Sequence, residues 1–156
     1  MASDLDTNSD ISLLHPRMQA KVLEVLKISK EKGLNLGVYE TVRSLKRQKL
    51  LVKRHYSETI YSYHVLGLAT DFVFKDKDGR WTWKVPKSKW EELAKILESV
   101  GLVAGWHWES LEDGPHGELK LHGISSKALH EKLNKLGSRE AFYKWLDENY
   151  FKSEKP

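Results

Sequence analysis

The sequence predicts an α+β fold, in which a small antiparallel sheet is flanked by helices and followed by a C-terminal helical extension. Three observations predict it. Apolar residues recur at helical spacing in several segments, they alternate with polar residues in shorter segments, and a hairpin turn signal, Asp76-Lys77-Asp78-Gly79, joins two of the alternating segments. The 156 residues suit one compact domain with a continuous core.

The first half of the chain predicts two helices around one strand. Apolar residues at helical spacing run from Pro16 to Gly33, typical residues for the start and the stop of a helix. An alternating segment at 34–41 predicts a strand. Ser44 is expected to cap a basic helix at 45–55. The buried stripe of that helix is expected to consist of Leu45, Leu50 and Leu51. Residues 56–63 lack periodicity and predict a loop.

The second half predicts the rest of the sheet. The expected elements are strands at 69–75 and 80–84, a helix at 87–100, and strands at 102–108 and 116–122. On the first of these strands Asp71 shares a face with the small Ala69. On the last, His116 and Glu118 share a face, which places Glu118 to orient a neighbouring ligand.

The C-terminal residues predict two further helices, at 126–136 and 138–150. We expect residues 1–124 to form the main domain, with 1–12 flexible. Residues 125–156 are expected to be a helical segment that packs on the same domain or forms a small appendage, and their length favours packing.

Composition narrows the class of protein. The chain has no cysteine, which excludes disulfides, thiolate zinc sites and cysteine nucleophiles. Its net charge of +4 favours polyanionic partners such as nucleic acid, anionic lipid or bacterial cell wall. The first ten residues have neither the basic start nor the apolar run of a signal peptide, and no apolar stretch is long enough to cross a bilayer. We therefore expect neither export by such a signal nor a membrane span.

Two histidines and two carboxylates carry the chemistry. His64 and Asp71 lie seven positions apart, and Gly67 between them allows a turn that brings His64 over the face of Asp71. Taken alone, this pair has a simpler interpretation, as a histidine in a loop and a carboxylate on the surface of a strand. The Gly114-Pro115 pair prevents a helix, so Asp113 and His116 enter the next strand from a loop. Two imidazoles and one carboxylate can bind Zn²⁺ with a fourth position open, the layout of a hydrolase.

These residues also carry a resemblance to a known family. The motif Ser62-x-His64-x-x-Gly67-x-Ala69-x-Asp71, together with Asp113-x-Pro115-His116, resembles the zinc D-Ala-D-Ala carboxypeptidase/endopeptidase superfamily. More narrowly, it is similar to the L-alanyl-D-glutamate peptidases of phage endolysins and bacterial wall hydrolases. The resemblance runs from about Leu14 to Leu119 and includes Val42-Arg43-Ser44 with Gln48. Residues 1–124 are therefore expected to be a zinc peptidase catalytic domain.

The resemblance implies a role for each site residue. His64, Asp71 and His116 would bind zinc, and Asp113 would be the catalytic general acid and base. It also implies that Arg43 lies near the metal, where its guanidinium can bind a substrate carboxylate or stabilise an oxyanion, and that Ser62 helps to bind substrate. The alternative for Arg43 is that it belongs only to the solvated basic run between residues 43 and 54.

Two departures from the family pattern concern substrate contacts. The chain has Gly105-Trp106-His107-Trp108 where a Gly-Gly pair usually precedes a charged residue and Trp, and it has Gly117 where an aromatic residue usually follows the last histidine. We expect both positions to border the cleft. His107 is either an extra contact to metal or substrate or, more simply, a histidine in the cleft wall.

The sequence therefore predicts a zinc metallopeptidase that cuts the peptide stem of bacterial peptidoglycan between L-Ala and D-Glu. Asp113-Gly114-Pro115-His116 favours this bond, because the vancomycin-resistance type carboxypeptidases resemble Glu-x-Trp-His there. The alternatives are a D,D-carboxypeptidase that removes terminal D-Ala and a non-catalytic wall-binding module. Nucleic-acid binding has only charge in its support, so we expect no nucleic-acid partner. The protein is expected to be a monomer, made in the cytoplasm, that reaches the wall after lysis, through a holin pore or by an unrecognised route.

Overall fold

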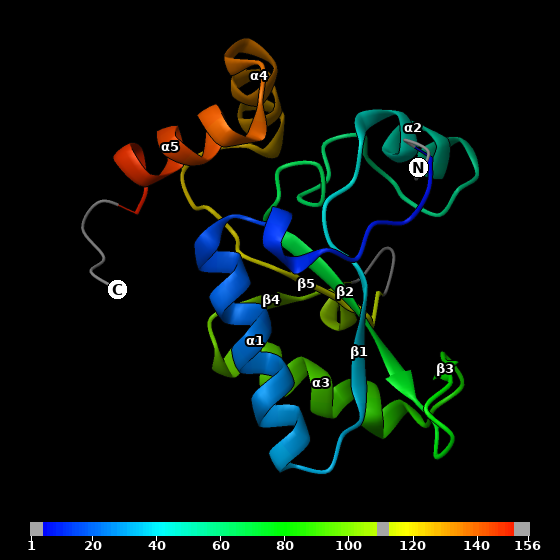
Figure 1. Ribbon diagram of the computed structural model, residues 1–156. Helices are drawn as coiled ribbons and strands as arrows, with labels where there is room; N and C mark the ends of the chain where they lie inside the picture. Colours follow the sequence, from blue (N-terminus) through cyan, green and yellow to red (C-terminus); the bar gives the residue numbers. More distant parts are fainter. Residues whose placement is uncertain (1–4, 109–112, 152–156) are drawn as a thin grey trace.

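The computed structural model describes residues 5–108 and 113–151 and has the predicted α+β architecture (Figure 1). A small open sheet lies between helices, with the last two helices at one end of the molecule. The elements in chain order are η1 (Ile11–Leu13), α1 (Pro16–Glu31), β1 (Leu36–Glu40), α2 (Leu45–Lys53), β2 (Ala69–Lys75), β3 (Trp81–Thr82), α3 (Lys87–Ser99), β4 (Val103–Ala104), η2 (Gly105–His107), β5 (His116–Glu118), α4 (Ser126–Leu136) and α5 (Arg139–Asn149).

The sheet is antiparallel in the order β1-β2-β5-β4, and β3 pairs with the far end of β2. The register places Asp71 of β2 directly opposite His116 of β5. On its other edge β2 pairs with β1, where the register shifts between Val38 and Glu40. Such a bulge re-aims the residues that follow it, and it brings Glu40 opposite Asp71.

The main core lies between the sheet and the helices α1 and α3. Helix α1 buries Met18, Val22 and Val25 as its spacing predicts, and α3 buries Leu93 and Leu97. These side chains meet Phe72 and Phe74, which point from β2 to that side of the sheet. The opposite face of β2 at Asp71 is thereby left free for a functional site.

A second apolar cluster joins the C-terminal helices to the loop before β2. Leu129 of α4 and Phe142 and Leu146 of α5 pack against Leu66 and Leu68. Gly67 lies between these two leucines with φ of +74°, and a Cβ atom there would come within 1.8 Å of the Tyr143 hydroxyl. The turn that carries His64 is thus the surface on which α5 lies.

Four details of the predicted elements are wrong. The strand predicted at 80–84 covers only Trp81–Thr82. Helix α2 buries Gln48, whereas Leu45, Leu50 and Leu51 are only half-buried, because this helix covers a polar loop instead of the core. The strand predicted at 102–108 ends at Ala104 and continues as η2. A Cβ at Gly105 would lie 2.5 Å from the Asp113 carbonyl, so the chain must turn there. The strand predicted at 116–122 ends at Glu118.

In the part of the chain that the structure describes, no helix combines the length and the apolar character that a bilayer crossing needs.

Candidate metal centre

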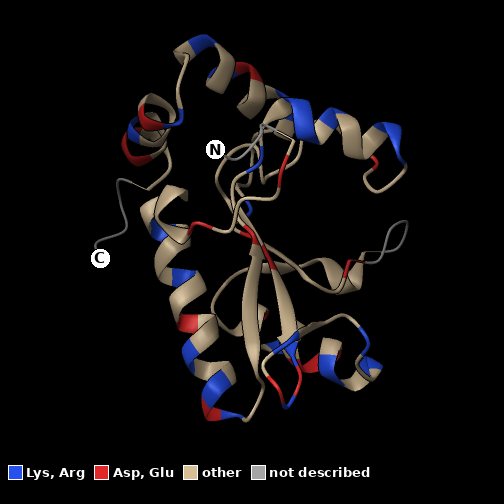
Figure 2. Cartoon of the chain, turned by 45° about the vertical axis from the view of Figure 1, so that its right-hand side comes forward, with Lys and Arg blue, Asp and Glu red and all other residues tan. Residues whose placement is uncertain are grey.

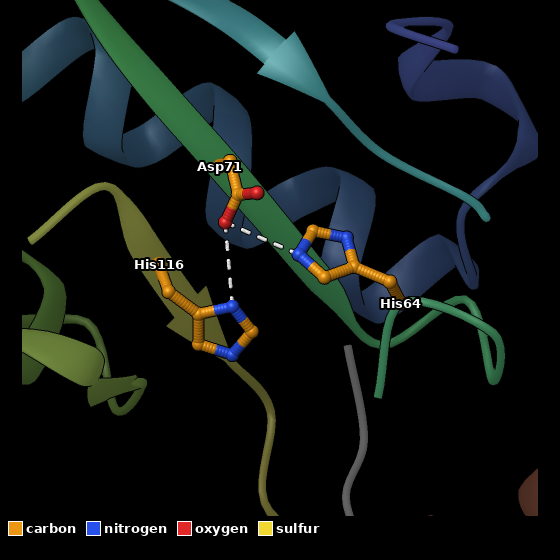
Figure 3. Close-up of side chains that lie close together, drawn as sticks. All are labelled: His64, Asp71 and His116. Atoms are coloured by element: carbon orange, nitrogen blue, oxygen red, sulfur yellow. Dashed lines mark ion pairs between the residues drawn. The ribbon is translucent and has the colours of Figure 1, made fainter. Parts of the chain in front are cut away.

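Three side chains from distant parts of the sequence converge on one point (Figure 3). His64 comes from the loop before β2, Asp71 from β2 and His116 from the start of β5. One ligand atom from each of them lies within 4.8 Å of the other two. Figure 3 shows one carboxylate oxygen of Asp71 facing both imidazoles. The structure therefore brings together the three residues that the sequence singled out as metal ligands.

His64 presents a defined nitrogen to this point. Its Nδ1 lies 2.7 Å from the Thr41 carbonyl oxygen. A carbonyl only accepts hydrogen bonds, so Nδ1 carries the proton and Nε2 keeps its lone pair. Nε2 faces Asp71 Oδ1 at 3.1 Å. The side chain is 1% exposed, so its orientation is fixed by the protein and not by solvent.

His116 presents the other type of nitrogen. Its Nε2 donates to Glu118 Oε1 at 2.7 Å, and its Nδ1 lies 3.3 Å from Asp71 Oδ1. A carboxylate behind a ligating imidazole fixes the ring and makes it more basic. The expectation that Glu118 orients a neighbouring ligand agrees with this contact.

The donor atoms fit a single tetrahedral zinc ion. Ligand atoms at about 2.0–2.1 Å from such an ion lie roughly 3.3 Å apart. Two of the three separations between ligand atoms, 3.1 and 3.3 Å, are close to that value. His64 Nε2 and Asp71 Oδ1 are also buried without a hydrogen-bond partner among the described residues. Buried polar atoms of this kind are costly unless something else binds them, and a cation at their meeting point would do so.

The electrostatics of the cluster also favour a cation. Burial by itself raises the pKa of Asp71, but the imidazoles of His64 and His116 outweigh it and hold that pKa well below the usual range. Burial lowers the pKa of His116, but the neighbouring carboxylates of Asp71 and Glu118 prevail and raise that pKa to about 10. The cluster thus attracts one positive charge, which a metal ion supplies in place of the proton.

Arg43 lies beside this cluster in a network of its own. Its guanidinium donates to Glu40 at 2.6 Å and to Gln48 at 2.8 Å, and it lies 3.5 Å from Asp71 Oδ2. Arg47 also donates to Glu40. Figure 2 shows acidic residues on strands of the sheet; Glu40 is the last residue of the edge strand β1, and Asp71 lies on β2. Arg43 is only 8% exposed, which argues against its belonging merely to a solvated basic run.

Asp113 lies next to the cluster without belonging to it. Burial is the main cause that raises its pKa, and the neighbouring Asp71 carboxylate adds to it. The backbone N–H of Asp113 donates a 2.9 Å hydrogen bond to the Gly105 carbonyl. This close contact positions the loop that carries Asp113. A carboxyl group with a raised pKa beside a metal cluster suits a proton carrier.

A cavity of about 690 Å³ opens over the cluster. Ser62 lines it, and the Ser62 hydroxyl accepts a hydrogen bond from the His64 backbone N–H. Trp108 lines it as well, with its ring centroid 4.7 Å from that of His116. The other lining residues that bear on function are Tyr39, Arg43, Trp83, Asp113 and Lys120. The cavity is large enough for a short peptide segment.

Three residues near the site differ from expectation. His107 points away from the cluster and pairs with Glu98 of α3 at 2.7 Å, with 61% of its side chain exposed. Gly117 faces the core, because a Cβ there would come 2.9 Å from Leu97. Trp106 packs against the core as well. Of the residues expected to border the cleft at these two positions, Trp108 does line the cavity, whereas the other three do not, because η2 turns the chain before Trp108.

Sequence reasoning missed the contribution of the C-terminal helices. His130 of α4 donates to the Ser62 carbonyl at 2.8 Å. Arg139 of α5 donates to the carbonyls of Val65 at 3.1 Å and Arg43 at 2.7 Å. The bonds fix the backbone on both sides of His64. The sequence does show one basic side chain on each of these amphipathic helices. It does not show their hydrogen-bond partners, which lie 68 to 96 residues away in sequence.

Comparison with known proteins places the chain among peptidases. Residues 55–119 match the family described as D-alanyl-D-alanine carboxypeptidase. The peptidoglycan L-alanyl-D-glutamate endopeptidase CwlK of Bacillus subtilis is 30% identical over 132 residues, which cover 74% of this chain and 77% of that protein. The L-alanyl-D-glutamate peptidase of Listeria phage A118 is 31% identical over 120 residues, 76% of this chain but 42% of that protein.

Solved structures agree with these matches. The L-Ala D-Glu endopeptidase ChiX of Serratia marcescens superposes with a TM-score of 0.59 at 27% identity, over 70% of this chain and 83% of that one. The LD-carboxypeptidase LdcB shares the fold, with a TM-score of 0.54 at 19% identity over 84% of this chain and 76% of that one.

Proposed function

Since the chain belongs to the superfamily of zinc D-Ala-D-Ala carboxypeptidases and L-alanyl-D-glutamate peptidases, we propose that it hydrolyses the peptide stem of bacterial peptidoglycan between L-Ala and D-Glu. The observation that carries the proposal is the cluster of His64, Asp71 and His116 at the floor of a cavity, with Asp113 beside it. This arrangement leaves room for a substrate and a proton carrier that is not a ligand.

His64 Nε2, Asp71 Oδ1 and His116 Nδ1 would hold the zinc ion. When bound, zinc polarises a carbonyl group and lowers the pKa of a water molecule. Thr41 and Glu118 keep the two imidazoles in the required tautomers. The two imidazoles are therefore oriented with a free nitrogen toward the position proposed for the ion.

Asp113 would take a proton from the attacking water and pass it to the leaving amine. Its raised pKa supports this role, because a more basic carboxylate takes the proton from the attacking water more readily. Arg43 would bind a substrate carboxylate or steady the negative charge that develops on the carbonyl oxygen, with its guanidinium held in place by Glu40 and Gln48. Ser62 would contact the substrate from the cavity wall.

Digestion of purified muropeptides by the zinc-loaded protein, followed by mass analysis, tests the proposal. We expect products that end in L-Ala and products that begin with D-Glu, and none of either from an Asp113→Asn variant. The family description of residues 55–119 supports D,D-carboxypeptidase activity as the second candidate. Loss of one D-Ala with no newly exposed D-Glu terminus would establish that candidate instead.

The site is built from one chain, which supports a monomer as the working form. Sedimentation of the zinc-loaded protein over a range of concentrations tests this. Access to the wall by lysis or through a holin pore is a further part of the proposal, supported by the phage relative.

A further inference from the structure

Aromatic side chains gather at one end of the cavity. The ring centroids of Tyr39 and Trp83 lie 4.9 Å apart at 78°, and those of Tyr39 and Trp81 lie 5.8 Å apart at 65°. Trp83 also stacks on Trp90, with centroids 6.5 Å apart and planes within 14° of parallel. These contacts fix the ring orientations. We call Tyr39, Trp81 and Trp83 the aromatic platform.

The aromatic platform is exposed although it is apolar. Trp81 is 52% exposed and Trp83 is 45% exposed. Tyr39 and Trp83 line the same cavity as His64, Asp71 and His116. Exposed aromatic surface that continues into a polar cavity is typical of a binding site, since such surface is otherwise buried in the core. The platform is thus the rim of the proposed active site and not an isolated patch.

Strand register places the platform relative to the metal cluster. Tyr39 occupies the bulge of β1, between Val38 opposite Phe72 and Glu40 opposite Asp71. Trp81 pairs with Lys75 at the far end of β2. Tyr39 and Trp83 therefore extend the lining of the cavity from the cluster onto aromatic rings on the β1 and β3 side.

A basic side chain also lines the cavity, beyond β5. Lys120 lines the cavity two residues beyond Glu118, which pairs with Ala69 at the start of β2. Its ammonium group lies 5.3 Å from the ring centroid of Tyr63. Lys120 thus contributes a cation to the cavity beyond β5, whereas Tyr39 and Trp83 contribute aromatic rings on the β1 and β3 side.

We propose that the aromatic platform is a subsite for a pyranose ring of the glycan strand, an inference that rests on the proposed function. The sugar lies on the amino side of the L-Ala–D-Glu bond, joined through a lactyl group and L-Ala, roughly two residue lengths or about 7 Å from it. Pyranose rings present flat C–H faces that stack on tryptophan. The stem carboxylates lie on the other side of the scissile bond, where Lys120 suits their charge.

Two substrates with the same stem peptide test this subsite. One carries the disaccharide of the glycan strand, and the other carries an acetyl group in its place. We expect wild-type protein to prefer the disaccharide substrate in kcat/KM by about three- to tenfold, the value of one good aromatic contact. Trp83→Ala should remove most of this preference, and Trp83→Phe should keep part of it. Leu23→Ala, a change of an exposed apolar residue on α1, should leave the preference intact.

Binding of the free disaccharide, measured by NMR at the Trp83 indole N–H, separates this inference from the proposed function. A shift of that signal in a protein that cleaves neither substrate would overturn the function and keep the subsite. No shift, together with an equal loss of activity on both substrates in Trp83→Ala, would overturn the subsite and keep the function. A single-stranded oligonucleotide that shifts the signal when the disaccharide does not would assign the platform to nucleobases and overturn the proposal.

Discussion

The Arg139 guanidinium on α5 donates a 2.7 Å hydrogen bond to the backbone carbonyl of Arg43, 96 positions earlier in the sequence. The same side chain donates to Val65, the residue after His64. One residue of the last helix thus positions two segments of the candidate active site. This relationship makes the C-terminal helices part of the site's support.

Replacing Arg139 with Ala should therefore destabilise the protein and loosen its metal site. Two carbonyl groups lose a charged donor, so we expect the free energy of unfolding to fall by about 2–4 kcal/mol. Urea unfolding measures this fall, and zinc competition measures the loss of metal affinity. Lys144→Ala, an exposed change on the same helix, is the matched control and should leave both values unchanged.

Zinc binding should depend on the three converging side chains. His64→Ala and His116→Ala should each lose stoichiometric zinc, as measured by elemental analysis after dialysis. Glu118→Gln keeps the ligand but weakens its orientation, so we expect affinity to fall by about 10–100-fold. His107→Ala serves as the control, because His107 pairs with Glu98 outside the cluster. Full zinc retention by both ligand variants would contradict the assignment.

Activity should fall in acid as Asp113 becomes protonated. A general base works only when it is ionised. We therefore expect kcat/KM to have its full value above the pKa of Asp113 and to decline as the pH falls through that pKa. Burial and Asp71 raise that pKa, which places the decline at a higher pH than for an ordinary aspartate. Asp113→Asn should lower kcat by about 10²–10⁴-fold. Asp78→Asn, in the exposed hairpin turn, should keep the wild-type pH profile.

Stability of the metal-free protein should fall as the pH drops below about 6.5. Burial is the main cause that lowers the pKa of both His15 and His130 from 6.5. A lowered pKa favours the neutral form of a histidine in the folded state. The contribution of the neutral histidines to the free energy of unfolding is therefore complete above pH 6.5, and it is lost as the pH falls through the pKa values of the folded state. His15→Asn keeps a helix-capping acceptor and should flatten the pH dependence of urea unfolding. An unchanged slope would count against this explanation.

Gly67→Ala should be far more damaging than Gly79→Ala. Both glycines have positive φ, +74° and +78°, so both substitutions strain the backbone by about 1–2 kcal/mol. Only at Gly67 does the added Cβ meet Tyr143 of α5, at 1.8 Å from its hydroxyl. We expect an additional cost of about 1–3 kcal/mol, seen in urea unfolding. Tyr143→Ala in the Gly67→Ala background should recover part of it.

The local elements and the chemical types of the site residues could be predicted from the sequence. Pro16 and Gly33 bracket α1, and Ser44 caps α2, because these signals act within a few residues. The alternation at 69–75 predicted which face of the strand carries Asp71. The Gly114-Pro115 pair predicted that His116 lies at the start of a strand. Predictions failed where a distant contact overrides the local pattern, as where Asp113 turns the chain at Gly105.

By itself, then, the sequence determined which residues could bind a metal and which family they resemble. Only the tertiary structure decided that His64 offers Nε2 and His116 offers Nδ1, because Thr41 and Glu118 occupy the other nitrogens. It also decided that Trp108, Tyr39 and Trp83, and not His107 or Gly117, line the cavity. The physical reason is that ring orientation, burial and cavity walls depend on residues that are distant in sequence, and no local spacing records those contacts.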